Sequence, residues 1–211
     1  MRKITVLLII LLAGFASKVN AQFGGGFTIN TTIGDLKFLN GVTDLKIEYS
    51  YDGMMVGNMT EEDYIVKHSA ELNKKKPGSG NDWKVKWVTD REKKLQPAFE
   101  RYFVKTMAKT GISASTTKTD AKYTLIIKTM MTEPGLYTGT VVGKATFINV
   151  DAIFIETGKP DVELCTIAAN HFIGDAGDFA SYDISLRLTA AYLGLGNRLG
   201  GYVLKAIKSK K

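Results

Sequence analysis

Three consecutive segments with alternating apolar residues dominate the second half of this 211-residue chain and restrict its fold most strongly. They are Ala121–Met131, Lys144–Glu156 and Asp161–Ile173, and the sequence TGKPD joins the last two. A period of two places successive side chains on opposite faces of a strand, and a short turn rich in Gly and Pro favours a hairpin. Asp44–Asp52 alternates in the same way. The sequence therefore predicts a mixed, mainly antiparallel sheet.

Two long helices are predicted to pack against this sheet. In the first, apolar residues repeat at helical spacing after Pro97, and Gly111 ends the pattern. The second has Asp183 as a plausible N-cap and continues almost to the C-terminus. Strands combined with helices in this order predict an α+β fold, arranged as a two- or three-layer sandwich.

The region between the first strand and the first long helix is predicted to be an insertion at about 54–82. Thr60 and the acidic residues after it predict the start of a short helix that contains His68. Lysine, proline, glycine and serine cluster in Lys74–Asp82, which predicts a flexible connection. The alternation of Trp83, Val85 and Trp87 with lysines then predicts a short strand.

The first 21 residues have the pattern of an export signal. A basic start, an apolar run and the small-residue motif that ends at Ala21 predict cleavage before Gln22. The apolar run stops at Lys18 and is shorter than the roughly 20 residues needed to span a bilayer, so no retained transmembrane helix is expected. The single cysteine, Cys165, lies far from the signal, so no lipid anchor is expected. The predicted organisation is a signal peptide (1–21), a partly flexible segment (22–43) and one domain (44–211).

The net charge does not favour a nucleic-acid partner. Cleavage of the signal removes Arg2, Lys3 and Lys18 and lowers the formal net charge from +7 to +4. The remaining clusters of lysine, at Asn73–Lys76 and at the C-terminus, are typical of solvated loops and tails. We therefore expect an exported globular protein that binds no nucleic acid.

Four glycines near the C-terminus resemble a phosphate-binding loop but do not meet its requirements. Gly194 and Gly196 match the first two positions of a dinucleotide fingerprint, but Leu199 occupies the third. Because each glycine in a helix interior costs about 1 kcal/mol, close packing must compensate for them. Gly194, Gly196, Gly200 and Gly201 are thus predicted to be helix-packing residues, against the protein's own sheet or against a second subunit.

The sequence contains candidate metal ligands but no catalytic motif. Met54, Met55 and Met59, close to His68, offer thioethers of the kind that select copper(I). Asp175, Asp178 and Asp183 offer oxygens to calcium, although no twelve-residue EF-hand pattern is present. Cys165 is expected to be a small apolar residue on a strand. No cofactor and no enzymatic activity are predicted.

The order of elements resembles that of a group of exported bacterial domains. The segments that carry the resemblance are FERYFVKTMAKTG, AKYTLIIKTMMTEPG, KATFINVDAIFIETGKPD, the strand with Cys165 and the glycine-bearing terminal helix. The group includes the periplasmic domain of the curli secretion-channel lipoprotein, the amino-terminal domain of the Tol-system propeller protein and lipoprotein activators of penicillin-binding proteins. The chain departs from it in lacking a lipid-bearing cysteine and in carrying the insertion.

Two functions remain open at this point. The resemblance implies an exported, non-enzymatic cell-envelope protein that acts through protein contacts in envelope or outer-membrane assembly, with an unknown partner and oligomeric state. The alternative is a periplasmic domain that binds a small ligand or a metal in the 54–82 insertion or in the 174–183 loop.

Overall fold

The central strand β6 (Tyr123–Glu133) joins a parallel part of the sheet to an antiparallel part. The computed structural model describes residues 26–137, 142–174 and 182–209. The eight-stranded sheet has the main order β1-β10-β9-β6-β2-β5. β2 is parallel to both of its neighbours, β5 and β6. On the other side of β6 each neighbouring pair is antiparallel: β6 with β9, β9 with β10, and β10 with β1. The sheet is mixed and mainly antiparallel, as the sequence predicts.

The other strands have the following bounds: β1 Thr28–Gly34, β2 Asp44–Ser50, β3 Met55–Val56, β4 Met59–Thr60, β5 Ser113–Ser115, β7 Leu136–Tyr137, β8 Val142–Lys144, β9 Phe147–Glu156 and β10 Glu163–Ile173. β3 pairs with both β4 and the end of β6, while β7 and β8 form a separate two-stranded sheet.

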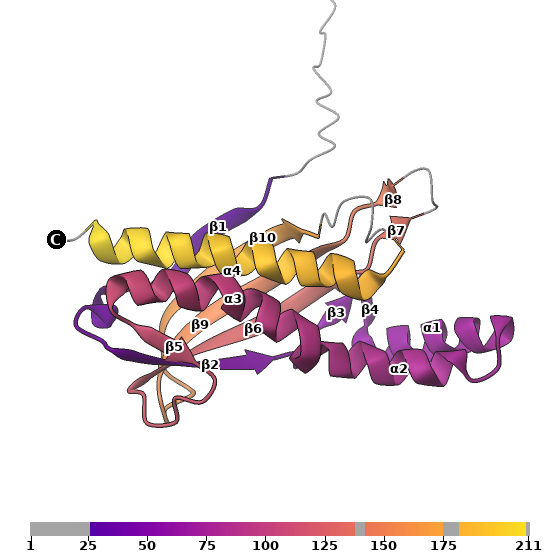
Figure 1. Cartoon of the computed structure of the whole chain (residues 1–211), viewed down its shortest axis with the longest axis horizontal. Coiled ribbons are helices and arrows are strands. Elements are labelled where there is room, and N and C mark those ends of the chain that lie inside the picture. Colours follow the sequence, from indigo (N-terminus) through magenta and orange to yellow (C-terminus); the bar gives the residue numbers. More distant parts are fainter. Residues whose placement is uncertain (1–25, 138–141, 175–181, 210–211) are drawn as a thin grey trace, which may run out of the picture.

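Helices α3 (Gln96–Met107) and α4 (Ile184–Lys208) lie side by side over one face of the sheet (Figure 1). The core between the two layers includes the buried side chains of Phe99, Phe103, Phe154 and Leu195. The buried Tyr192 hydroxyl of α4 and Thr129 Oγ1 of β6 share a hydrogen bond of 2.6 Å. This arrangement is an α+β fold with two layers, which confirms the predicted fold class.

The predicted insertion at about 54–82 overlaps a hairpin of two helices, α1 (Glu61–Lys75) and α2 (Ser79–Asp90), which protrudes from the end of the sandwich (Figure 1). The predicted cap is present, because Thr60 Oγ1 accepts a hydrogen bond from the backbone N–H of Asp63 at 3.1 Å. The predicted strand at Trp83–Val88 is wrong, because these residues belong to α2.

The flexible connection predicted over Lys74–Asp82 is also wrong, since only a short turn separates the two helices. Close packing fixes this turn: a Cβ at Gly80 would lie 2.0 Å from the carbonyl oxygen of Ser69. Glycine therefore lets the two helices of the hairpin meet.

The hairpin continues into the core helix without a loop. A five-residue π-helix, η2 (Arg91–Leu95), links α2 directly to α3. Short 3-10 helices, η1 (Lys37–Leu39) and η3 (Ala108–Thr110), complete the helical elements of the described chain. Because π-helical turns interrupt the regular hydrogen-bond ladder, η2 marks the point where the hairpin leaves the body.

The segment 22–43, which we expected to be partly flexible, contributes an ordered edge strand. β1 pairs with β10 along most of its length. The ring of Phe27 lies 4.9 Å from that of Phe172, and Thr31 Oγ1 shares a hydrogen bond of 2.9 Å with the Tyr202 hydroxyl of α4. These contacts tie the strand to both layers, so the described part of this segment, from residue 26, belongs to the domain.

Candidate functional site

A mainly apolar hollow lies between the helical hairpin, the start of α4 and the nearby end of the sheet. Its volume is about 340 Å³. Both tryptophans of the chain, Trp83 and Trp87, are in its wall. We call it the hairpin cavity, and its lining residues are Tyr51, Met54, His68, Leu72, Trp83, Lys86, Trp87, Asp90, Arg91, Leu95, Thr132, Tyr182, Asp183, Ile184, Ser185, Leu188 and Tyr192.

An aromatic cluster builds the hairpin side of this cavity. The His68 ring stacks on Tyr64 with centroids 5.4 Å apart and meets Trp83 edge-on at 4.5 Å. Trp83 and Trp87 are 5.4 Å apart, because residues four positions apart share one face of a helix. Burial lowers the pKa of His68 below its usual value, so its ring is neutral at neutral pH.

Glu61 at the start of α1 anchors the hairpin to the body. The indole Nε1 of Trp87 donates a hydrogen bond to Glu61 Oε1 at 2.6 Å, and the guanidinium of Arg91 forms an ion pair with the same oxygen. Arg91 also lies over the ring of Tyr51, 4.2 Å from its centroid. One carboxylate and one guanidinium therefore link α1 and α2 to Tyr51, the residue that follows β2.

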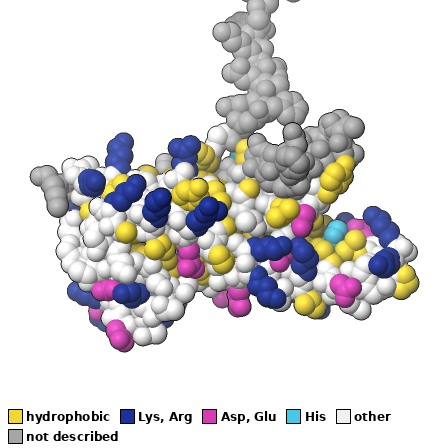
Figure 2. All heavy atoms as spheres, in the orientation of Figure 1, with side chains coloured by type: hydrophobic (Ala, Val, Ile, Leu, Met, Phe, Trp, Pro, Cys, Tyr) yellow, Lys and Arg dark blue, Asp and Glu magenta, His cyan; other side chains and the backbone are white. Residues whose placement is uncertain are grey.

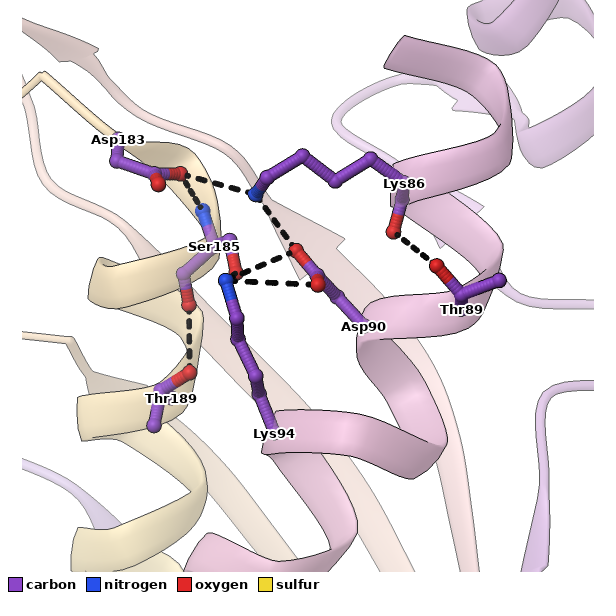
Figure 3. Close-up of polar contacts among 7 residues, drawn as sticks. All are labelled: Lys86, Thr89, Asp90, Lys94, Asp183, Ser185 and Thr189. Atoms are coloured by element: carbon purple, nitrogen blue, oxygen red, sulfur yellow. Dashed lines mark hydrogen bonds and ion pairs between the residues drawn. The ribbon is translucent and has the colours of Figure 1, made fainter. Parts of the chain in front are cut away.

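A network of charged residues crosses from α2 to α4 beside the cavity (Figure 3). Lys86 Nζ lies 2.7 Å from Asp90 Oδ2 and 3.6 Å from Asp183 Oδ1. Lys94 Nζ lies 3.4 Å from Asp90 Oδ1 and donates to Ser185 Oγ at 3.1 Å. Burial raises the pKa of Asp90, but the hydrogen bonds from Lys86 and Ser185, together with the charges of Lys86 and Lys94, outweigh it, so that the pKa is lowered overall. The charges of this network balance one another.

The chemistry of the cavity favours a neutral, apolar occupant. Aromatic, aliphatic and thioether side chains make up most of the wall, whereas Lys86, Asp90, Arg91 and Asp183 are all engaged in ion pairs. The hydroxyl of Tyr51 is buried and makes no hydrogen bond of ordinary geometry within the described residues. A charged ligand would lose its hydration in this cavity without gaining an ion pair, because the charged residues of the wall are already paired.

A wider hollow of about 660 Å³ adjoins the cavity and shares His68, Tyr182 and Ile184 with it. Its wall is more polar: it contains the ion pair of Lys144 with the buried Glu133, and also Arg187. Arg187 Nε donates to Thr146 Oγ1 at 2.7 Å. These contacts hold the end of the sheet against the start of α4.

The candidate copper ligands lie in different surroundings in the structure. Met54 is buried in the wall of the hairpin cavity, and its sulfur accepts a hydrogen bond from Thr132 Oγ1 at 3.4 Å. Met55 is exposed on β3, while Met59 on β4 borders the wider hollow. His68 lines both hollows, so it shares one with Met54 and the other with Met59.

The candidate calcium ligands Asp175 and Asp178 lie outside the described residues, and Asp183 caps α4 by accepting a hydrogen bond from the Ser185 N–H at 2.8 Å. Within residues 26–137, 142–174 and 182–209, no group of three or more His, Cys, Asp or Glu residues is placed to hold a metal ion.

The four glycines of α4 fall into two pairs with different surroundings. A Cβ at Gly196 would lie 2.2 Å from the carbonyl oxygen of Phe99, and a Cβ at Gly200 would lie 3.0 Å from Thr106 Cβ. Both contacts are with α3, whereas we expected the protein's own sheet or a second subunit. Gly194 and Gly201 have open space beside them, so the expectation of close packing does not hold for these two within the described chain.

Sequence reasoning missed most of the cavity because it placed the tryptophans on a strand. The missed lining residues include Trp83, Lys86, Trp87 and Arg91. The spacing of Trp83 and Trp87 by four positions, which matches that of Tyr64 and His68, was the signal for two facing helices.

Comparison of the chain with models of protein families, with curated proteins and with solved structures finds no match. In the part of the chain that the structure describes, no helix has the length and apolar character required to cross a membrane.

Proposed function

We propose that the chain is an exported cell-envelope protein that binds a small, neutral, mainly apolar ligand in the hairpin cavity. One observation carries the proposal: an apolar space of about 340 Å³ whose charged groups are already paired with one another. Ligand sites of this kind are concave, mostly apolar and largely preformed. The proposed site lies between the α1–α2 hairpin and the start of α4.

Trp83 and Trp87 provide a direct test, because they are the only tryptophans and both line the cavity. The neutral probe N-phenyl-1-naphthylamine should quench their emission and become fluorescent, with a dissociation constant on the order of 10 µM. An uncharged alcohol with a long alkyl chain should displace it. The corresponding quaternary alkylammonium ion and alkyl sulfate should bind more weakly, because charge burial is costly.

A matched pair of variants identifies the site of binding. Leu72→Phe with Ile184→Phe adds volume inside the cavity and should weaken probe binding by at least tenfold. Val66→Phe with Leu186→Phe adds the same side chains to the same two helices at exposed positions, and it should leave binding unchanged. Equal probe binding by both double variants would contradict the proposal.

A second candidate function is the protein contact that the resemblance implies. It is supported by the exposed side chains of Val66, Val85 and Val88 on a hairpin whose first helix buries no residue. A photoreactive amino acid at Val85 should then give one discrete crosslinked product in the native cell, and the same group at Lys122 should give none. Crosslinking at Val85 that is no more specific than at Lys122 would contradict this candidate.

A further inference from the structure

The outer surface of the two-helix layer carries an excess of positive charge (Figure 2). Glu100 is the only acidic residue of α3 and α4, and it accepts a hydrogen bond from the Tyr49 hydroxyl at 3.1 Å. The exposed basic residues of α3, η3 and α4 form what we call the basic face: Arg101, Lys105, Lys109, Arg198, Lys205 and Lys208.

These six side chains form no ion pair with the described residues, unlike the cations around the hairpin cavity. Two of them lie near aromatic rings: the Arg198 guanidinium is 5.1 Å from the ring centroid of Phe27, and that of Arg101 is 5.8 Å from the ring centroid of Tyr102. The helix dipole favours cations in a last turn, which accounts for Lys105, Lys205 and Lys208. It does not account for Arg101 or Arg198, which lie before the last turn of their helices.

Leucines accompany the cations along α4. Leu186 is 41% exposed, and Leu193 and Leu204 are half-buried, Leu193 with part of its side chain against the core. Leu193 follows Leu186 by seven positions and Leu204 follows Leu193 by eleven, and residues at either spacing lie on the same side of an α-helix. The layer therefore presents a row of apolar side chains next to unpaired cations.

We infer that the basic face binds the surface of a bilayer that contains anionic phospholipids. Headgroup phosphates attract clustered lysines and arginines, and leucines gain from contact with the boundary of the acyl chains. A soluble polyanion would satisfy the cations but offer nothing to the leucines, so the combination favours a membrane. The inference goes beyond ligand binding in the hairpin cavity and does not depend on it.

The test is sedimentation of the chain from Gln22 to Lys211 with lipid vesicles. We expect binding to phosphatidylcholine vesicles with about one third phosphatidylglycerol at low salt, and loss of binding at about 0.5 M salt, where charges are screened. Vesicles of phosphatidylcholine alone should not bind. The triple variant Arg101→Glu, Lys105→Glu, Lys205→Glu should bind anionic vesicles at least tenfold more weakly.

The control carries the same change in net charge on the hairpin: Lys74→Glu, Lys76→Glu, Lys84→Glu, all at exposed positions. It should bind the vesicles as the wild type does. Equal weakening by both triple variants would overturn the inference, because net charge alone would then explain binding. Retention on heparin without binding to anionic vesicles would also overturn it, in favour of a soluble polyanion. Circular dichroism establishes that both variants are folded, and probe binding in the hairpin cavity should be the same in both.

Discussion

The backbone of α4 at Gly196 lies so close to Phe99 of α3 that a Cβ there would be 2.2 Å from the Phe99 carbonyl oxygen. Since a backbone atom cannot move aside as a flexible side chain can, the two helices must separate if the residue gains a side chain. This contact explains why the middle of a core helix tolerates a residue with a low helix propensity.

The first prediction compares two glycines of one helix. Gly196→Ala should lower the free energy of unfolding by about 2 kcal/mol or more, because it forces α3 and α4 apart. Gly194→Ala should raise it by about 0.5–1 kcal/mol, because its Cβ meets open space and alanine favours the helix. Urea denaturation followed by circular dichroism measures both. Destabilisation of the same size at both positions would contradict this account of the packing.

The second prediction concerns Glu61, whose carboxylate is largely buried between Trp87 and Arg91. Glu61→Gln should destabilise the fold by about 2–4 kcal/mol, because it leaves the guanidinium of Arg91 without its counter-charge. The neighbouring Glu62→Gln, at an exposed position, should change stability by less than about 0.5 kcal/mol. Denaturant unfolding monitored by tryptophan emission tests both variants, and near-equal effects would show that Glu61 does not anchor the hairpin.

The third prediction compares two buried tyrosine hydroxyls. Tyr51→Phe should leave stability unchanged or raise it by up to about 1 kcal/mol, since it removes a buried hydroxyl that makes no hydrogen bond of ordinary geometry in the described chain. Tyr192→Phe should cost about 1–2 kcal/mol, because Thr129 loses its hydrogen-bond partner. Thermal unfolding of the two variants gives the order, and a larger loss for Tyr51→Phe would show that its hydroxyl has a partner.

The fourth prediction is a dependence of stability on pH. Burial lowers the pKa of His68 from 6.5, so the unfolded chain takes up its proton at a higher pH than the folded chain does. The contribution of His68 to stability should be complete above pH 6.5 and should decrease as the pH falls through this value towards the folded-state pKa.

An NMR titration should give a pKa below 6.5 for the His68 ring, with the resonance assigned by its absence in His68→Gln. Between pH 7.5 and 5.5, the wild type should lose more stability than this variant does. A pKa at or above 6.5 would contradict the burial of the ring.

The fifth prediction concerns Cys165, which lies inside β10 with its side chain fully buried. Burial raises the pKa of its thiol to about 11, so the thiolate that reacts is scarce at pH 8. Iodoacetamide should leave the folded protein unmodified at pH 8 and should modify it fully in denaturant, as mass spectrometry can show. Rapid modification of the folded protein would indicate that the strand opens.

The sequence alone specified most of the sheet and both core helices. Strands β2, β9 and β10 lie within the segments with alternating apolar residues, β6 extends two residues beyond its segment, and α4 follows its predicted cap at Asp183. These elements were predictable because each has an apolar periodicity that matches its own geometry and is long enough to be distinctive. The signal peptide and the export of the chain remain predictions from the sequence.

The tertiary structure decided the conformation of the hairpin and therefore the candidate site. The alternation of Trp83, Val85 and Trp87 fits a strand, whereas the spacing of Trp83 and Trp87 by four positions fits one face of a helix, and only contacts with α1 distinguish the two. The hydrogen bond of Trp87 to Glu61 and the close approach of Gly80 to Ser69 supply these contacts. The cavity is formed by residues far apart in the sequence, so local patterns could not reveal it: its walls exist only where α2, α4 and the end of the sheet meet.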